Sequence, residues 1–193
     1  MLNKFRDSLR PLLQNIGKAF ASSGLSANVW TAIGLGFAFA SSLVYGLHPQ
    51  YSLVLGGVLL LVSGFFDIVD GQVARATNSS SKKGAFLDSV FDKVAEVSIF
   101  LGIFIGGYFP QGYLVLIALS LSLLVSYTRA RAESLGIQLQ GIGIGERAER
   151  LLVIALVGMA GPVFMNYAVI IVIIISGITL AQRIAATSKK LSV

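Results

Sequence analysis

The sequence contains no cysteine, which excludes a disulfide framework and a metal site built from thiolates. Charge is also scarce: charged residues make up 12% of the 193 residues, whereas soluble domains carry about 25%. This scarcity argues against a soluble enzyme, a disordered chain and a nucleic-acid-binding domain. The hydrophobic content of 55% is instead typical of a protein that crosses a membrane several times.

Six apolar stretches predict six transmembrane helices, because about 20 apolar residues are needed to cross a bilayer. The fourth and fifth helices are expected to extend into their charged ends. We therefore predict an all-α integral membrane protein that forms a single domain over residues 1–193. The six stretches cover residues 27–47, 51–66, 85–109, 112–127, 151–164 and 166–180.

The basic residues indicate how these helices cross the membrane. All fifteen lie toward the same side of the predicted topology, and the connections near His48, Gln111 and Pro162 contain none. The positive-inside rule places the basic side, with both termini, in the cytoplasm of the cell. Six spans, an even number, are consistent with both termini lying on one side of the cell membrane.

The first 24 residues are predicted to form an amphipathic helix in the cytoplasmic interface rather than a signal peptide. Four basic residues are interspersed there, and Pro11 stands where a signal peptide would have a continuous apolar core. A plain juxtamembrane tether is the alternative. Apolar residues recur at steps of about three and four, which is typical of a helix with one apolar face; they are Leu2, Phe5, Leu9, Leu12, Leu13, Ile16 and Phe20.

Four aspartates lie in or beside the predicted spans, where an unpaired carboxylate is costly. Asp67 and Asp70 share one helical face at i and i+3, and Asp88 and Asp92 share a face of the next helix at i and i+4. The connection over residues 75–83 is short, so the helices are antiparallel neighbours and the two pairs can face each other. These hard oxygen ligands suit Mg²⁺ or Mn²⁺, and two ions would balance four carboxylates.

Small and charged residues accompany the aspartates. Gly71 and Ala74, on the Asp67 face, leave room either for a ligand or for close packing of helices. Arg75 either clamps a phosphate or extends to the membrane interface. Glu96 lies one turn beyond the last aspartate and either bonds across helices or supports a ligand.

The spacing of these residues resembles the signature of the CDP-alcohol phosphotransferases. That signature is D-x-x-D-G-x-x-A-R, a spacer, and G-x-x-x-D-x-x-x-D. The chain carries the first part from Asp67 to Arg75 and, after eight residues, the second part from Gly84 to Asp92, so that all eight fixed positions match. Hydropathy, six spans and size also resemble the family over nearly the whole chain.

The resemblance implies a transferase that splits a CDP-linked lipid. Asp67, Asp70, Asp88 and Asp92 would bind the metal ions, and Asp92 would also be the catalytic general base. It would take the proton of an acceptor hydroxyl as that oxygen attacks the lipid-side phosphorus and CMP leaves. The donor would be CDP-diacylglycerol or CDP-archaeol.

The resemblance also implies which residues hold the CDP-lipid. The start of the first span is similar to the family's P-N-x-x-T segment, although Ala27 replaces the proline. Ser81 stands where related enzymes carry a hydroxyl residue at the nucleotide. The implied CDP-lipid residues are Asn28, Thr31, Asp67, Gly71, Ala74, Arg75, Ser81 and Gly84.

Arginines near the cytoplasmic ends of the later spans favour a phosphorylated acceptor, because a guanidinium binds phosphate oxygens bidentately. The runs R-A-R-A-E-S-L-G and G-E-R-A-E-R-L are similar to the branch of the family that uses inositol 1-phosphate. The alternative is charge that only sets topology, with local ion pairs between Arg129 and Glu133 and between Glu146 and Arg150. The candidate acceptor-phosphate residues are Arg129, Arg131, Arg147 and Arg150.

Two alternatives to this function remain open. Within the family, the acceptor can be another alcohol such as glycerol 3-phosphate or serine. Intramembrane carboxylates alone would also suit a small ion-coupled transporter, although no charged residue lies in the outer half of any predicted span. The expected partners are membrane lipids and, from the resemblance and the glycines in the spans, a second copy in a homodimer; no nucleic acid is expected.

Overall fold

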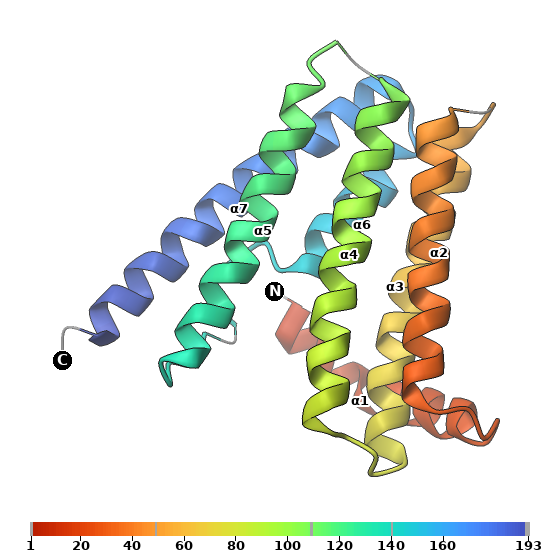
Figure 1. Ribbon diagram of the computed structural model, residues 1–193, viewed down its shortest axis with the longest axis vertical. Helices are drawn as coiled ribbons and strands as arrows, with labels where there is room; N and C mark the ends of the chain where they lie inside the picture. Colours follow the sequence, from red (N-terminus) through yellow and green to blue (C-terminus); the bar gives the residue numbers. More distant parts are fainter. Residues whose placement is uncertain (1, 49, 109, 140, 192–193) are drawn as a thin grey trace.

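The structure, a computed structural model, describes residues 2–48, 50–108, 110–139 and 141–191, and for residues 2–10 it describes only the backbone. Residue 1 of the predicted N-terminal segment and residue 109 of a predicted span lie outside the described residues. Within the described part every regular element is an α-helix, which confirms the all-α prediction (Figure 1). The helices are α1 (Leu2–Ala21), α2 (Ala27–Leu47), α3 (Ser52–Ala76), α4 (Lys82–Gly106), α5 (Tyr113–Ser134), α6 (Arg147–Gly158) and α7 (Pro162–Leu191).

Among the described residues, four helices are long and apolar enough to cross a membrane: α2, α3, α5 and α7. The 25-residue α4 is as long as α3, but it carries Asp88 and Asp92 in its first half. The 12-residue α6 is only about 18 Å long, which is shorter than the roughly 30 Å hydrocarbon core of a bilayer. Several apolar helices of spanning length make the chain a multi-pass membrane protein.

The boundary between the last two helices differs from the prediction, which ended one span at residue 164. α6 already ends at Gly158, and α7 begins at Pro162. Gly161 has a φ of 132°, which residues with a side chain rarely adopt. Pro162 occupies the first position of α7, where its missing N–H leaves no hydrogen bond unmade.

Close packing along α2 fixes the relative positions of α3 and α4. A Cβ atom placed on Gly102 of α4 would overlap the carbonyl oxygen of Ser42 on α2, so only glycine permits this approach. The Ser42 hydroxyl donates to the Ser98 carbonyl at 2.5 Å, and the Ser63 hydroxyl of α3 donates to the Gly34 carbonyl at 2.8 Å. α2 therefore holds the two helices that carry the aspartates.

The N-terminal helix α1 lies across the end of the helix group in Figure 1 and packs on α3. A Cβ atom on Gly17 would lie 2.9 Å from both Cβ and the carbonyl oxygen of Gln72, so the two helices nearly touch there. The Phe20 ring contacts Trp30 and Phe66, with centroids 4.9 and 6.5 Å away. α1 is thus attached to the end of α3 that carries its aspartates.

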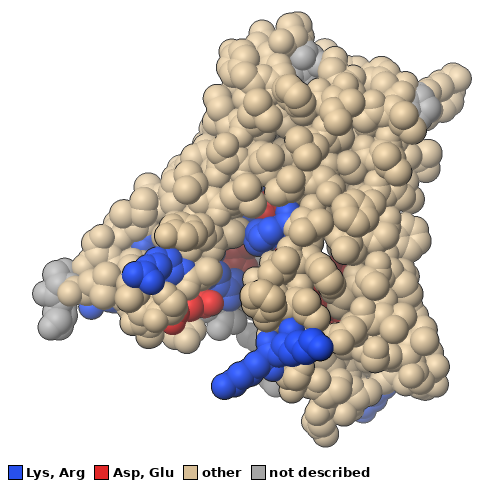
Figure 2. Space-filling view, viewed as in Figure 1, with Lys and Arg blue, Asp and Glu red and all other residues tan. Residues whose placement is uncertain are grey.

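Charged side chains gather toward the end of the molecule where α1 lies. Figure 2 shows blue and red atoms at the middle of this face and below it, and none toward its upper end. Many large apolar side chains are exposed on the long helices, including Leu43, Ile105 and Ile174. Such exposure is expected where lipid rather than water covers the surface.

Candidate active site

Three aspartates meet where α3 ends and α4 begins. One carboxylate oxygen each of Asp67, Asp88 and Asp92 lies within 4.8 Å of the other two. A short connection reverses the chain between the two helices, and the Ser81 hydroxyl accepts a hydrogen bond at 3.0 Å from the backbone N–H of Gly84. This N-cap satisfies a donor that the first turn of a helix leaves free.

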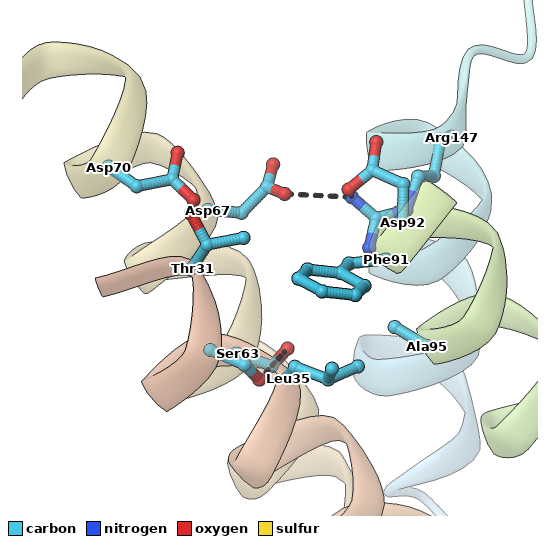
Figure 3. A pocket seen from close by; sticks show the side chains of 10 residues that line it. Thr31, Leu35, Ser63, Asp67, Asp70, Phe91, Asp92, Ala95 and Arg147 are labelled. Atoms are coloured by element: carbon cyan, nitrogen blue, oxygen red, sulfur yellow. Dashed lines mark hydrogen bonds and ion pairs between the residues drawn. The ribbon is translucent and has the colours of Figure 1, made fainter. Parts of the chain in front are cut away.

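Asp70 lies beside these three residues, and the four are called the aspartate cluster below. Asp70 is 6% exposed, and its Oδ2 atom has no hydrogen-bond partner. Figure 3 shows the Asp70 side chain next to Thr31, one turn along α3 from Asp67. An unpartnered buried carboxylate oxygen is unfavourable unless a cation or a hydrogen bond compensates it. Four oxygen-donor side chains in this arrangement therefore fit a divalent cation.

Arg147, the first residue of α6, reaches the aspartate cluster (Figure 3). Its Nη1 atom lies 2.9 Å from Asp67 Oδ1 and 2.6 Å from Asp92 Oδ1. The Arg147 side chain is 18% exposed, so these ion pairs are partly shielded from water. One guanidinium therefore links α6 to both helices that carry the aspartates.

A larger cavity of ≈ 280 Å³ opens next to the cluster, between the start of α2, the end of α3 and the start of α4. Seven of the eight predicted CDP-lipid residues line it; Asp67 instead lines a smaller cavity around Arg147. The predicted metal ligands Asp70 and Asp88 line it as well. Ser26, Ser79, Ser80 and Ala85 were not predicted, although the serine run before α4 is a visible signal for an anion site. The lining residues are Ser26, Ala27, Asn28, Thr31, Asp70, Gly71, Ala74, Arg75, Ser79, Ser80, Ser81, Gly84, Ala85 and Asp88.

Gly71 borders open space rather than a neighbouring helix. A Cβ atom placed on it would meet only the Arg75 side chain, with Nη2 at 3.5 Å. Of the two alternatives for this glycine, room for a ligand therefore agrees with the geometry, and close helix packing does not. The Arg75 guanidinium lies at the same wall of the cavity.

Arg150 does not reach either cavity. It is fully buried and pairs with the equally buried Glu96, with Nη2 2.6 Å from Glu96 Oε1. The alternative interpretation, a local pair of Arg150 with Glu146, is therefore wrong, because the partner comes from α4 across the helix contact. This pair also answers the open question about Glu96, which bonds across helices.

The two arginines of α5 form no ion pair with the aspartate cluster among the described residues. Arg129 pairs with Glu133 at 2.9 Å on an exposed surface, as the alternative interpretation expected. Arg131 is within 3.4 Å of the Ser134 hydroxyl. Among the described residues, Arg147 is the one predicted acceptor arginine that contacts the cluster.

Two polar residues of α7 with no predicted site role hold the segment before α6. The Thr179 hydroxyl accepts hydrogen bonds from the N–H groups of Ile144 and Gly145, at 3.2 and 2.9 Å. Arg183 is 2% exposed and donates to the carbonyls of Ile142 and Val125. Thr179 near the end of the last apolar stretch and Arg183 just beyond it gave only a weak signal in the sequence.

Comparison with known proteins identifies related chains. A family model described as CDP-alcohol phosphatidyltransferase matches residues 25–184. The archaetidylinositol phosphate synthase of Pyrococcus horikoshii is 38% identical over 193 residues, covering 99% of this chain and 98% of that protein. The archaetidylinositol phosphate synthase of Methanothermobacter thermautotrophicus is 40% identical over 188 residues, covering 95% and 92%.

A solved structure has the same fold. Phosphatidylinositol phosphate synthase of Mycobacterium tuberculosis with CDP-DAG bound gives a TM-score of 0.79 at 27% identity, covering 92% of this chain and 94% of that chain. The same protein in complex with manganese and citrate also gives a TM-score of 0.79 at 27% identity, covering 91% and 88%. The family match includes every residue of the aspartate cluster and of the larger cavity.

Proposed function

Since the chain belongs to the CDP-alcohol phosphatidyltransferase family, we propose that it transfers a phosphatidyl-type group from a CDP-lipid to inositol 1-phosphate and releases CMP. The observation that carries this proposal is the aspartate cluster beside the ≈ 280 Å³ cavity. Relatives of nearly the same length, 38% and 40% identical, are archaetidylinositol phosphate synthases. They support inositol 1-phosphate as the acceptor and CDP-archaeol as the donor. The solved relative with CDP-DAG bound supports CDP-diacylglycerol as the other candidate donor.

The larger cavity is the proposed site of the CDP portion of the donor. Arg75 supplies a guanidinium that can bind pyrophosphate oxygens through two parallel hydrogen bonds. Gly71 and Ala74 leave space beside it, and the start of α4 adds the favourable end of a helix dipole for an anion. The other proposed CDP-lipid residues are Asn28, Thr31, Asp67, Ser81 and Gly84, and the donor's lipid chains remain in the membrane.

The aspartate cluster is proposed to hold two Mg²⁺ or Mn²⁺ ions through Asp67, Asp70, Asp88 and Asp92. When bound, the ions would neutralise the pyrophosphate and the charge that develops during transfer. The unpartnered oxygen of Asp70 supports this assignment, as does a relative that was solved with manganese.

Asp92 is the proposed general base. As the acceptor hydroxyl oxygen bonds to the lipid-side phosphorus, Asp92 takes the hydroxyl proton, and the bond from that phosphorus to the bridging oxygen breaks to release CMP. Arg147, 2.6 Å from Asp92, is the cation best situated to bind the phosphate of the acceptor next to this base. Arg129, Arg131 and Arg150 have a weaker claim, because no contact joins them to the cluster.

The membrane arrangement is proposed to follow the sequence prediction. The chain forms one domain with six membrane helices, α4 and α6 included, and α1 lies in the cytoplasmic interface. The 12-residue α6, about 18 Å long, crosses only part of the hydrocarbon core by itself. Both termini and the active site then face the cytoplasm. Exposed glycines such as Gly36, which no neighbouring atom covers, leave a face on which a second copy can pack to form a homodimer.

The acceptor is tested by comparing alcohols on the purified protein. With CDP-archaeol or CDP-diacylglycerol and Mg²⁺, we expect inositol 1-phosphate to give the highest kcat/KM for CMP release, above glycerol 3-phosphate, serine and inositol. We also expect Arg147→Ala to raise the KM of the acceptor by on the order of tenfold or more, while the exposed Lys82→Ala serves as the unchanged control. A higher kcat/KM with any of the other alcohols would refute the acceptor assignment.

A further inference from the structure

A fully buried ion pair joins α4 to α6 about one helical turn beyond Asp92 of the aspartate cluster. Glu96 and Arg150 both have 0% exposure. Arg150 Nε and Nη2 donate to Glu96 Oε1 at 3.1 and 2.6 Å, and Lys93 Nζ lies 3.4 Å from Glu96 Oε2. Burying such a pair costs desolvation that its attraction barely offsets, so stability alone is a weak reason for its presence.

A second ion pair, between Arg147 and Asp92, joins the same two helices. On α4, Glu96 follows Asp92 by four residues, and on α6, Arg150 follows Arg147 by three, so each pair shares a helical face. Arg147 contacts Asp92 at 2.6 Å, and Arg150 contacts Glu96 at 2.6 Å. The two ion pairs are therefore neighbouring cross-links between one face of α4 and one face of α6.

The backbone of α6 packs on helices other than α4. α6 packs mainly on α7 and α3, so its link to α4 rests on long side chains rather than on close backbone packing. Arg150 Nη1 also donates to the Gly145 carbonyl at 2.8 Å, and the Gly145 N–H donates to Thr179 on α7. The same guanidinium thus ties α4 to the segment through which the chain enters α6.

We infer that Glu96 and Arg150 are positioning residues that hold Arg147 in register with Asp92. A helix rises 1.5 Å per residue, so a slip of α6 by one residue would break a contact of 2.6 Å. The inference rests on the proposed function, in which Arg147 binds the acceptor next to the base. Loss of register would then weaken use of the acceptor and leave the CDP-lipid cavity, which neither residue lines, unchanged.

The test removes both charges of the pair. Glu96→Gln and Arg150→Met alone each leave a buried charge without its partner, so we expect each to lower Tm more than the double variant does. We expect the double variant to raise the acceptor KM by on the order of tenfold, with the CDP-lipid KM within about twofold of the parent. Ser41→Ala, which removes a buried hydrogen bond between α2 and α3, controls for simple destabilisation.

A further measurement separates positioning from general stability. In an Arg147→Ala background, the double variant should change the acceptor KM little further, because it acts through Arg147. The inference would be overturned if the double variant recovered the parent's acceptor KM as its Tm rose above that of the single variants. It would also be overturned if the double variant raised the acceptor KM equally with and without Arg147.

A spectroscopic readout keeps the inference testable apart from the acceptor. The chain has no cysteine, so spin labels can be attached through Val90→Cys on α4 and Leu156→Cys on α6, both exposed positions. We expect the distance distribution between the labels to shift or broaden in the double variant. An unchanged distribution would overturn the inference, whereas a parent that releases no CMP with any acceptor would refute only the proposed function.

Discussion

Gly71 gives a test in which stability and substrate binding change in opposite directions. In Gly71→Ala the added Cβ meets only the Arg75 guanidinium, with Nη2 at 3.5 Å, which is ordinary van der Waals contact. Replacing a glycine inside a helix by alanine stabilises it by roughly 0.5–1 kcal/mol, which raises Tm by up to about 2–4 °C for a chain of this size. We therefore expect a folded protein that is slightly more stable than the parent.

The same methyl group enters the cavity proposed for the CDP portion of the donor. It is small against ≈ 280 Å³, but it lies at the wall formed with Arg75, so it would displace the bound phosphates rather than fill the cavity. A displacement of about 1 Å can cost a factor on the order of 100, so we expect kcat/KM for the CDP-lipid to fall by between about 10- and 100-fold.

Steady-state CMP release at varied CDP-lipid, together with thermal unfolding in the same detergent, measures both effects. Gly64→Ala is the matched control, because Gly64 lies on the same helix with no neighbouring atom within 4 Å of its Cβ position. We expect it to be equally stable and kinetically unchanged. If the two variants had the same kinetics, or if Gly71→Ala lowered Tm, the ligand role of this glycine would be refuted.

Three further predictions concern the metal site, the donor site and the packing of α2. Chelation with EDTA should abolish CMP release, and Mg²⁺ or Mn²⁺ should restore it in the parent but not fully in Asp88→Asn. Arg75→Lys keeps the charge but loses the planar fork, so the KM of the CDP-lipid should rise by on the order of tenfold. Gly102→Val should lower the free energy of unfolding by about 1–3 kcal/mol or more, because the valine side chain meets the Ser42 backbone. A lower Tm in thermal unfolding would show this loss.

Helix positions were readable from the sequence wherever hydropathy and helical faces agree. The stretch predicted over residues 27–47 coincides with α2, and α3 continues from its apolar part through Asp67 and Asp70 to Ala76. The predicted meeting of carboxylates from two helices also exists for Asp67, Asp88 and Asp92. Spacing alone sufficed here because one short connection fixes which faces of neighbouring helices can meet.

Contacts between distant segments were not readable in this way. Arg150 has a carboxylate four residues before it, Glu146, so a local ion pair was the alternative to binding the acceptor phosphate. Its actual partner, Glu96, is 54 residues away, and only the crossing of α4 and α6 brings the two together. The roles of Thr179 and Arg183 in holding the segment before α6 depend equally on how α7 packs.

The most direct test of the proposed function follows the phosphate of the acceptor. Inositol 1-phosphate labelled on its phosphorus is incubated with CDP-archaeol or CDP-diacylglycerol, Mg²⁺ and the purified protein, and the label in the lipid phase is counted against the CMP released. We expect one labelled lipid for each CMP, and none for Asp92→Asn. CMP release that leaves the label in the aqueous phase, or undiminished transfer by Asp92→Asn, would contradict the proposed reaction.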